Sequence, residues 1–290
     1  MNRYEEYLDL LSKSYEEAVD WLLQKYGPAQ DDYFRESSYM RFMNGEIKNI
    51  TKGKASRTSE GLYCHHIDEL KWLKISDQNF VKEFNIPFEN QRKNRLVYCD
   101  LVEHTILHVL IIKETSFEYG YPGYEAFLKP AIVEWYLDER IPNPEWMKKC
   151  YIKSFLEPQI AFDLIKGMQK VLGESYFNTL VEYYDEKKKI EENRNKWQEQ
   201  FKQKRIDERA YEIKKAKQLH HKSPRSEIVN TSYLIRIYYK NLIGSGSFNN
   251  SITFKEYDKE MKKYMKEEIL DDLLVYIESS PALGGEESNK

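Results

Sequence analysis

The chain has 290 residues, of which 41% are hydrophobic and 32% charged, a balance that excludes both a disordered chain and a fibrous one. The net charge of -3 excludes a uniformly basic protein that coats nucleic acid, so any contact with phosphates requires a local basic patch. The cysteines, Cys64, Cys99 and Cys150, are odd in number and scattered, which excludes a disulfide framework and predicts a cytoplasmic protein.

The first predicted element is one long amphipathic helix over residues 1–28. Apolar side chains recur there at helical spacing, and the pattern stops at Gly27 and Pro28, a pair that commonly ends a helix. Residues 29–60 follow with a mixed polar sequence and a small basic patch, made of Lys52, Lys54 and Arg57. We take these three side chains as candidates for contacts with a nucleic-acid backbone.

Two short β-prone runs come next, LYCHHI at 62–67 and RLVYC at 95–99. Asp100 follows the second run directly, and Glu103 stands three residues later. This is the spacing of a capping box, in which each carboxylate accepts the amide hydrogen of the other residue. A helix is therefore predicted to begin at Leu101.

Helical patterns separated by prolines and a glycine fill residues 125–184 and predict a helical domain. A long charged helix is predicted over 185–222, where the segment 187–217 holds twelve Lys and Arg against six Asp and Glu. Because one sparse apolar stripe survives on it, this helix is interpreted either as a solvated or coiled-coil helix or as an arm that binds the DNA backbone. A C-terminal subdomain over 223–278 and a flexible tail over 279–290 complete the predicted organisation.

Four of the six histidines fall within 44 residues, in two close pairs. His104 and His108 are four residues apart on the predicted helix, so both rings lie on one face, as two ligands of a single metal ion require. His65 and His66 are neighbours on the first predicted strand, where successive side chains point to opposite faces. One member of this pair is then free to bind metal while the other faces a substrate.

This arrangement resembles the ββα-metal core of HNH endonucleases, also called His-Me finger nucleases. The resemblance covers about residues 61–112, and we expect the nuclease domain to span 29–124. It rests on His65-His66-Ile67, on Asn94 shortly before the second strand, and on His104 with His108 on the following helix. The final H-x-x-x-H spacing is most similar to that of the bacterial nuclease toxins of the colicin type.

The resemblance implies a role for each histidine. His65, together with His104 and His108, would hold one divalent metal ion, and His66 would be the general base that activates water. The reaction would be hydrolysis of phosphodiester bonds, leaving 5′-phosphate ends. The expected cofactor is one ion of Mg²⁺, Mn²⁺, Ni²⁺ or Zn²⁺, and the all-nitrogen ligand set favours the borderline transition metals over Mg²⁺.

Two features depart from the family pattern. The middle Asn of the family directly precedes the Leu of the second strand, whereas here Arg95 stands in that place and Asn94 lies one residue earlier. Both are kept as catalytic candidates, Asn94 to brace the loop and Arg95 to contact the scissile phosphate. The segment 67–93 between the two strands is also longer than in minimal members, and it is interpreted as an inserted loop that shapes substrate access.

The sequence thus predicts an α+β fold, mostly α-helical, in which a small ββα-metal nuclease core is embedded among helices. The expected partner is DNA, with RNA as a second substrate, and the helical region offers a route to a homodimer. No stretch of about 18 apolar residues occurs, so no contact with a membrane is expected. Phages, mobile elements and defence systems are the usual settings of such cores. The competing hypothesis is a non-catalytic nucleic-acid-binding or protein-binding module that keeps the core as a structural metal site.

Overall fold

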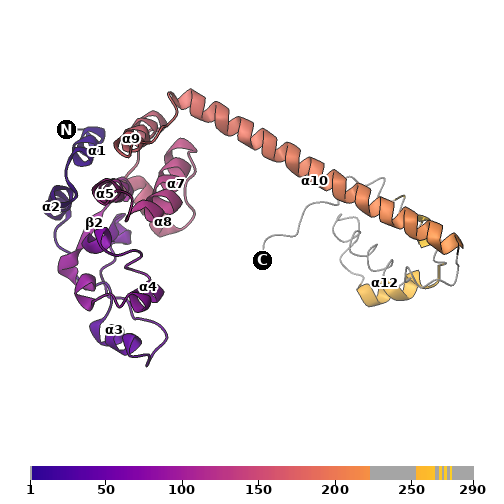
Figure 1. Cartoon of the computed structure of the whole chain (residues 1–290), viewed down its shortest axis with the longest axis horizontal. Coiled ribbons are helices and arrows are strands. Elements are labelled where there is room, and N and C mark those ends of the chain that lie inside the picture. The colour runs from indigo at the N-terminus through magenta and orange to yellow at the C-terminus, as the bar shows by residue number, and fades with distance from the viewer. Residues whose placement is uncertain (1, 223–252, 265–267, 270, 273–274, 276–290) are drawn as a thin grey trace. The chain divides into compact units, whose positions relative to one another are not determined.

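The computed structural model (Figure 1) describes residues 2–222, 253–264, 268–269, 271–272 and 275. Over these residues the chain is mostly helical with one small antiparallel sheet, which confirms the predicted α+β class. The chain forms two compact units, Met1–Tyr183 and Tyr184–Lys290. Most of the predicted C-terminal subdomain at 223–278, and the whole predicted tail at 279–290, lie outside the described residues.

Two helices form the N-terminus, so the prediction of one continuous helix over residues 1–28 is wrong. They are α1 (Arg3–Ser12) and α2 (Tyr15–Tyr26). The chain breaks between them because the Ser14 hydroxyl accepts the amide hydrogen of Glu17, while the Glu17 carboxylate accepts that of Ser14. This capping box begins a new helix, and its Ser-x-x-Glu spacing is present in the sequence.

The histidine-bearing segment has the predicted order of strand, strand and helix. β1 (Tyr63–His66) and β2 (Leu96–Cys99) pair in antiparallel fashion. α5 (Leu101–Glu114) begins at its predicted residue because Asp100 caps it in a complete capping box with Glu103. The two strands and the helix place all four clustered histidines within one local motif.

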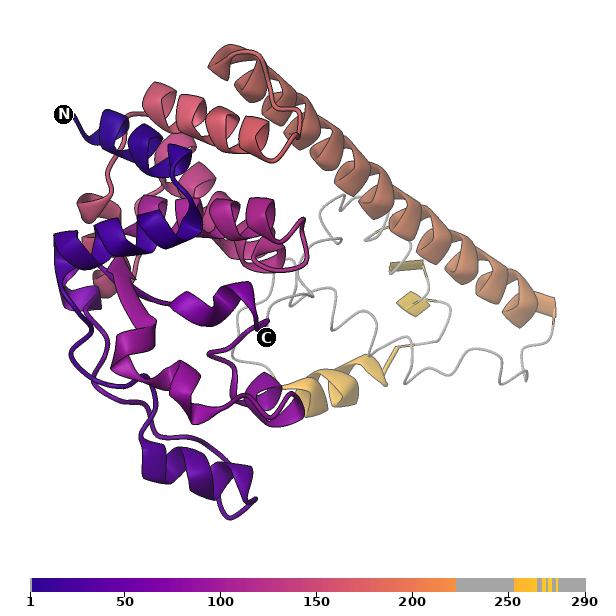
Figure 2. The ribbon, with the colours of Figure 1, turned by 60° about the vertical axis from the view of Figure 1, so that its left-hand side comes forward.

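α5 lies at the centre of the core of the first unit. Nearly all of its side chains are buried, since other helices rather than solvent surround it. α1, α2, the helical segment Tyr121–Leu137 and α9 (Pro158–Val171) pack against it (Figures 1 and 2). α8 (Glu145–Lys153) packs instead against the short helical turn Thr58–Glu60. The helix that carries His104 and His108 is therefore held from several sides.

The helical segment Tyr121–Leu137 alternates between α-helical and π-helical turns. α6 (Tyr121–Gly123) and α7 (Lys129–Ile132) are α-helical, and the π-helical turns are Tyr124–Leu128 and Val133–Leu137. The first turn of this segment lies directly against a ring of the histidine cluster. The segment thus closes one side of the candidate site.

Residues 29–60 and the predicted inserted loop at 67–93 together form a small second core. α3 (Glu36–Met43) and α4 (Gln78–Glu83) line this core. Its buried side chains are Phe34, Tyr39, Phe42, Ile50, Ile75, Val81, Ile86 and Phe88. The inserted segment is therefore folded, and it brings the buried side chain of Gln91 to the sheet.

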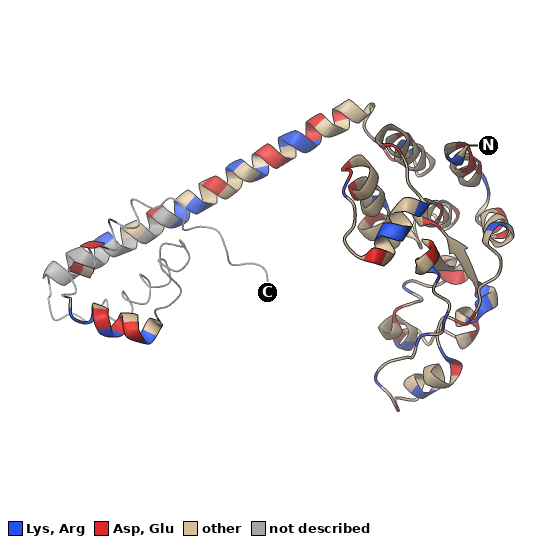
Figure 3. Cartoon of the chain, turned by 180° about the vertical axis from the view of Figure 1, so that it is seen from behind, with Lys and Arg blue, Asp and Glu red and all other residues tan. Residues whose placement is uncertain are grey.

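α10 (Leu180–Lys222) is one continuous helix, which begins five residues before its predicted start at 185. Basic and acidic residues are interspersed along its described part (Figure 3), and some of them pair within the helix, as Arg194 does with Glu191. Trp197 and Phe201 are exposed on it and stack on each other. α12 (Phe254–Met261) follows later in the chain. None of the described helices combines the length and apolar character that crossing a membrane requires.

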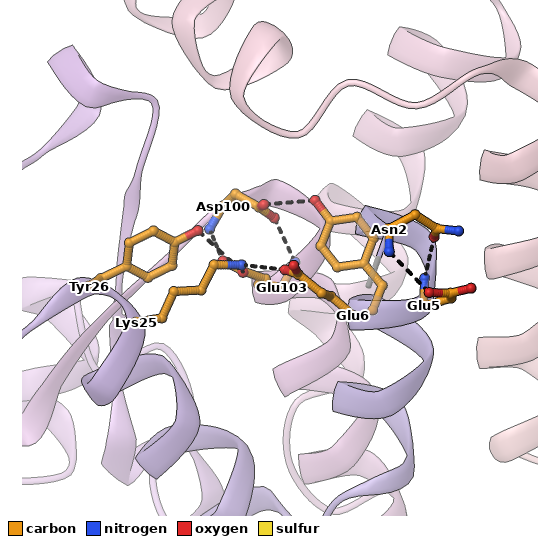
Figure 4. Close-up of polar contacts among 8 residues, drawn as sticks. Asn2, Glu5, Glu6, Lys25, Tyr26, Asp100 and Glu103 are labelled. Carbon is orange, nitrogen blue, oxygen red and sulfur yellow. Dashed lines mark hydrogen bonds and ion pairs between the residues drawn. The ribbon is translucent and has the colours of Figure 1, made fainter.

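A buried polar network ties α1 and α2 to the start of α5 (Figure 4). The Tyr7 hydroxyl donates to Asp100 at 2.7 Å. Lys25 Nζ donates to Glu103 at 2.8 Å. The Tyr26 hydroxyl also donates to Glu103, at 3.2 Å. Burial, followed by repulsion from the Glu103 carboxylate, raises the pKa of Asp100 to about 7. The network fixes the beginning of the helix that carries two of the candidate metal ligands.

Candidate metal centre

Three of the four clustered histidines meet at one place in the first unit. His65 comes from β1, and His104 and His108 come from one face of α5. The ring centroid of His104 lies 5.1 Å from that of His65 and 5.0 Å from that of His108. One possible ligand atom from each ring lies within 4.8 Å of the other two. The structure thus brings the three predicted metal ligands together.

The hydroxyl of Tyr15, on α2, determines which nitrogen of His65 faces the cluster. It lies 2.9 Å from His65 Nε2 and 2.9 Å from the carbonyl oxygen of Ile67. Because a carbonyl only accepts, the hydroxyl hydrogen is donated to Ile67, and His65 Nε2 must donate to the Tyr15 oxygen. The lone pair of His65 is then on Nδ1, a buried atom with no hydrogen-bond partner among the described residues. Such outer hydrogen bonds orient metal-ligating imidazoles in proteins.

His108 is oriented in the same way by a backbone carbonyl. Its Nδ1 lies 2.9 Å from the carbonyl oxygen of Gly120, so Nδ1 carries the hydrogen and donates it. Its Nε2 is the nitrogen left to ligate a metal, and it lies 3.0 Å from the carboxylate of Glu69. The two oriented rings therefore each present one defined nitrogen to the cluster.

The third ring, that of His104, has two orphaned polar atoms. Both of its nitrogens are buried and have no hydrogen-bond partner within the described part of the chain. Buried polar atoms without partners destabilise a fold by about 1–3 kcal/mol each, so they are rare unless an ion or a water satisfies them. Three converging imidazoles, two of them with unpartnered nitrogens among the described residues, are a suitable donor set for Zn²⁺, Ni²⁺ or a similar ion, and the residues therefore fit the predicted metal.

Burial determines the charge of the cluster. It lowers the pKa of His65 to about 3, and it also lowers the pKa of His104. Burial is the largest single influence on His108 and would lower its pKa too. The hydrogen bond to Glu69, the charge of that carboxylate and the hydrogen bond to Gly120 together outweigh burial, so the pKa of His108 is raised. Two of the three rings are therefore neutral near pH 7, which is the form that binds a metal.

His66, the predicted general base, is on the opposite face of β1 from the three clustered rings of His65, His104 and His108, and it is only 1% exposed. Its Nε2 lies 3.1 Å from Gln91 Oε1, and the amide nitrogen of Gln91 donates to the carbonyl oxygen of Ile75. This second bond fixes the amide orientation, so His66 Nε2 donates and the lone pair is on Nδ1. The ring of Tyr33 packs edge-on against His66, with centroids 4.4 Å apart. Burial lowers the pKa of His66, which keeps it in the neutral form that a base requires.

The two remaining catalytic candidates have different surroundings. Asn94 is exposed and makes no hydrogen bond with the residues that the structure describes, so its predicted bracing of the loop is wrong. Arg95 instead braces the motif, because its guanidinium forms two hydrogen bonds with the Asp68 carboxylate, at 2.8 and 2.6 Å. This fork joins the turn after β1 to the start of β2. A contact between Arg95 and the scissile phosphate stays a prediction.

The three basic candidates at 52–57 also differ in their surroundings. Lys52 Nζ lies 5.7 Å from the ring centroid of Tyr33, and so stands on the His66 side of the sheet. Lys54 is exposed, and its backbone amide donates to Asp31. Arg57 pairs with Glu60 and has a side chain that is only 18% exposed. Of the three, Lys52 is therefore best placed to contact a substrate bound near His66.

We expect Gly123→Ala to weaken metal binding without removing any polar group. A Cβ at this position would lie 2.6 Å from His108 Cε1, closer than van der Waals contact allows, so the ring must move. We expect metal affinity to fall by about tenfold, the lower range seen when the support of a ligand is disturbed. Chelator competition with Zn²⁺ on the full chain measures this change.

The matched control is Gly167→Ala in α9. A Cβ there has no neighbour closer than Leu11 Cδ2, at 3.9 Å, so the substitution meets no steric conflict and raises helix propensity. Metal affinity should stay at the value of the unaltered chain. Equal affinities for Gly123→Ala and Gly167→Ala would contradict the placement of His108 at the metal.

Three residues that support the histidines were not predicted from the sequence, namely Tyr15, Glu69 and Gln91. Tyr15 is 50 residues away from the histidine that it contacts, and Gln91 is 25 residues away. No local pattern marks such distant partners. Glu69, by contrast, follows His65 by only four residues, and its carboxylate was available as a candidate ligand within the same motif.

No protein-family model, no curated protein and no solved structure matches the chain.

Proposed function

We propose that this chain is a metal-dependent endonuclease of the HNH type that hydrolyses phosphodiester bonds in DNA. The observation that carries the proposal is the convergence of His65, His104 and His108. Nδ1 of His65 and both ring nitrogens of His104 are buried there without hydrogen-bond partners among the described residues. The first strand and the helix supply these ligands, and the elements follow in the order of strand, strand and helix that is expected of a ββα-metal core. A divalent ion held there would act as a Lewis acid that stabilises the leaving oxygen.

His66 supplies the base in this proposal. Its neighbours Gln91 and Ile75 fix the tautomer that leaves the lone pair on Nδ1, and burial keeps the ring neutral. A neutral, oriented imidazole removes a proton from an attacking water, a step that typically contributes about 10²–10⁴-fold to the rate. Lys52, which lies beside Tyr33 on the same side of the sheet, is the basic residue that we assign to the phosphate backbone.

A structural metal site is the second candidate function. Its supporting observation is burial, because His65 and His66 are 0% and 1% exposed. Structural metal sites are closed by protein ligands, whereas catalytic sites keep a position open for water or substrate. The chain would then be a non-catalytic module that binds nucleic acid or protein, and His66 would have no chemical role.

The deciding experiment is cleavage of supercoiled plasmid by the purified full chain with Mg²⁺, Mn²⁺, Ni²⁺ or Zn²⁺. We expect metal-dependent nicking, and we expect His66→Ala to lower its rate by about 10²-fold or more while metal affinity is retained. Glu83→Ala is the control, because this exposed side chain lies in α4 and is not among the candidate site residues. Absence of cleavage with all four ions would contradict the enzyme, and an RNA substrate in the same assay shows whether RNA is cleaved instead.

The second unit is proposed to contribute substrate contacts. α10 carries an excess of basic side chains, and the stacked pair of Trp197 and Phe201 is exposed on it. Basic side chains bind phosphates and exposed aromatic rings stack on unpaired bases, which favours DNA over a second copy of the chain as its partner. A cytoplasmic location is proposed as well, since all three cysteines are free thiols.

A further inference from the structure

Glu69 is a charged side chain at the histidine cluster to which the proposed reaction gives no role. It lies in the helical turn Ile67–Leu70, directly after β1. Its Oε2 is 3.0 Å from His108 Nε2 and 3.8 Å from His65 Nδ1, and the side chain is 20% exposed. The carboxylate thus faces the same two nitrogens that the outer hydrogen bonds leave free for a metal.

The outer hydrogen bonds of His65 and His108 show which ring nitrogens face the Glu69 carboxylate. The bond to Tyr15 places the hydrogen of His65 on Nε2, so no hydrogen lies between His65 Nδ1 and the carboxylate oxygen. His108 likewise has its Nδ1 hydrogen committed to Gly120. The carboxylate oxygen and the two remaining ring nitrogens, His65 Nδ1 and His108 Nε2, therefore face one another, and one cation can join such donor atoms.

We propose that Glu69 is a fourth protein ligand of the metal, so that the site is a three-histidine, one-carboxylate centre. Metal bonds of about 2.0–2.1 Å in a tetrahedron place neighbouring ligand atoms about 3.3–3.4 Å apart. The two distances from Glu69 Oε2, 3.0 and 3.8 Å, lie on either side of that spacing. The inference rests on the proposed metal centre and adds to it a ligand that the three-histidine pattern lacks.

A carboxylate ligand has two chemical consequences. It cancels one of the two charges of the ion, which lowers the cost of holding that ion in a buried site. It also closes the fourth position of a tetrahedral ion such as Zn²⁺, whereas a six-coordinate ion such as Mn²⁺ keeps positions for a phosphate. Zn²⁺ should therefore bind tightly as a closed site, and cleavage should favour an ion with more than four ligands.

The test compares the unaltered full chain with Glu69→Gln and Glu69→Asp. Zn²⁺ affinity is measured by chelator competition, and ligand number by the visible absorption of bound Co²⁺. Glu69→Gln keeps the shape but removes the charge, and we expect it to lower Zn²⁺ affinity by at least about tenfold and to change the Co²⁺ spectrum. Glu69→Asp keeps the charge on a shorter side chain and should fall between the two. Glu83→Gln is the control, because this exposed Glu lies in α4 and is not part of the histidine cluster.

The outcomes separate the inference from the proposed function. If the unaltered chain binds Zn²⁺, and both Glu69 variants bind it with the same affinity and the same Co²⁺ spectrum, the fourth ligand is refuted and the three-histidine centre stands. If the unaltered chain binds neither ion, the metal centre itself fails, and the inference fails with it. Circular dichroism of each variant confirms that the helices are retained, and Glu69→Asp serves as the test should Glu69→Gln not fold.

Discussion

His104→Ala is expected to lower the affinity for Zn²⁺ or Ni²⁺ by about a hundredfold or more and to remove metal-dependent nicking. The substitution removes one of three imidazole ligands. Loss of an outer hydrogen bond alone lowers metal affinity by roughly 10- to 100-fold, and loss of a ligand should lower it further. The metal should also stabilise the unaltered chain, by about 2.7 kcal/mol at a free metal concentration of about 100 times Kd. This stabilisation should be nearly absent in the variant.

The effect of His104→Ala on the unfolding temperature should depend on whether metal is bound. Without metal, the two ring nitrogens of His104 are buried and unpartnered among the described residues, so removing the ring relieves a cost while it opens a small cavity. We therefore expect similar unfolding temperatures for the two chains in a chelator and a clear difference when Zn²⁺ is present. Differential scanning calorimetry with and without Zn²⁺ measures both quantities.

A histidine in the other compact unit provides the control. His220→Ala alters a residue of α10, which belongs to Tyr184–Lys290, and should leave the metal-dependent shift in place. An equal shift in His104→Ala and in the unaltered chain would show that the ion binds elsewhere. Such a result would contradict the metal centre, whatever the nuclease assay gives.

Glu103→Ala is expected to lower the free energy of unfolding of the first unit by about 3 kcal/mol. The Glu103 side chain is 0% exposed, and it accepts hydrogen bonds from Lys25, from Tyr26 and from the Asp100 amide. Its removal leaves these donors in or near the core with fewer partners, and it removes half of the capping box of α5. Chemical denaturation followed by circular dichroism measures the loss.

The matched control is Glu6→Ala, at the outer end of the same network. The Glu6 side chain is 33% exposed and pairs with Lys25 at 3.1 Å. Exposed ion pairs contribute only about 0–1 kcal/mol, because solvent screens them and two long side chains must be ordered. If Glu103→Ala costs no more than Glu6→Ala, the buried network does not hold α5 in place.

Local signals determined the framework of the candidate site. The capping box of Asp100 and Glu103 predicted the first residue of α5, and the four-residue spacing of His104 and His108 predicted that both rings share a face. Both β-prone runs became the paired strands. Such features depend on neighbours within about one turn of helix or one strand pair, so a single sequence contains them. The break before Ser14 obeys the same rule, and it was missed because the apolar spacing continued across it.

Residues that are distant in sequence from the histidines they contact could not be predicted from such local patterns. Tyr15 and Gln91, which fix the tautomers of His65 and His66, lie on other elements, and only the packing of α2 and of the second small core places them. Gly123 is similar, since its lack of a side chain matters only because the His108 ring lies against it. A side chain at such positions shows no periodicity, so its role is invisible before the chain folds.

The shared face of His104 and His108 and the order of strand, strand and helix were thus predictable from the sequence itself, because spacing and capping act between close neighbours. Tertiary structure alone decided that His66 is turned toward Gln91 and that Arg95 pairs with Asp68. It also decided that the Glu69 carboxylate contacts the His108 ring, since the turn after β1 must fold back toward α5 before carboxylate and imidazole can meet. The physical reason is range, because protonation, orientation and ligation depend on atoms within a few ångströms, whatever their separation along the chain.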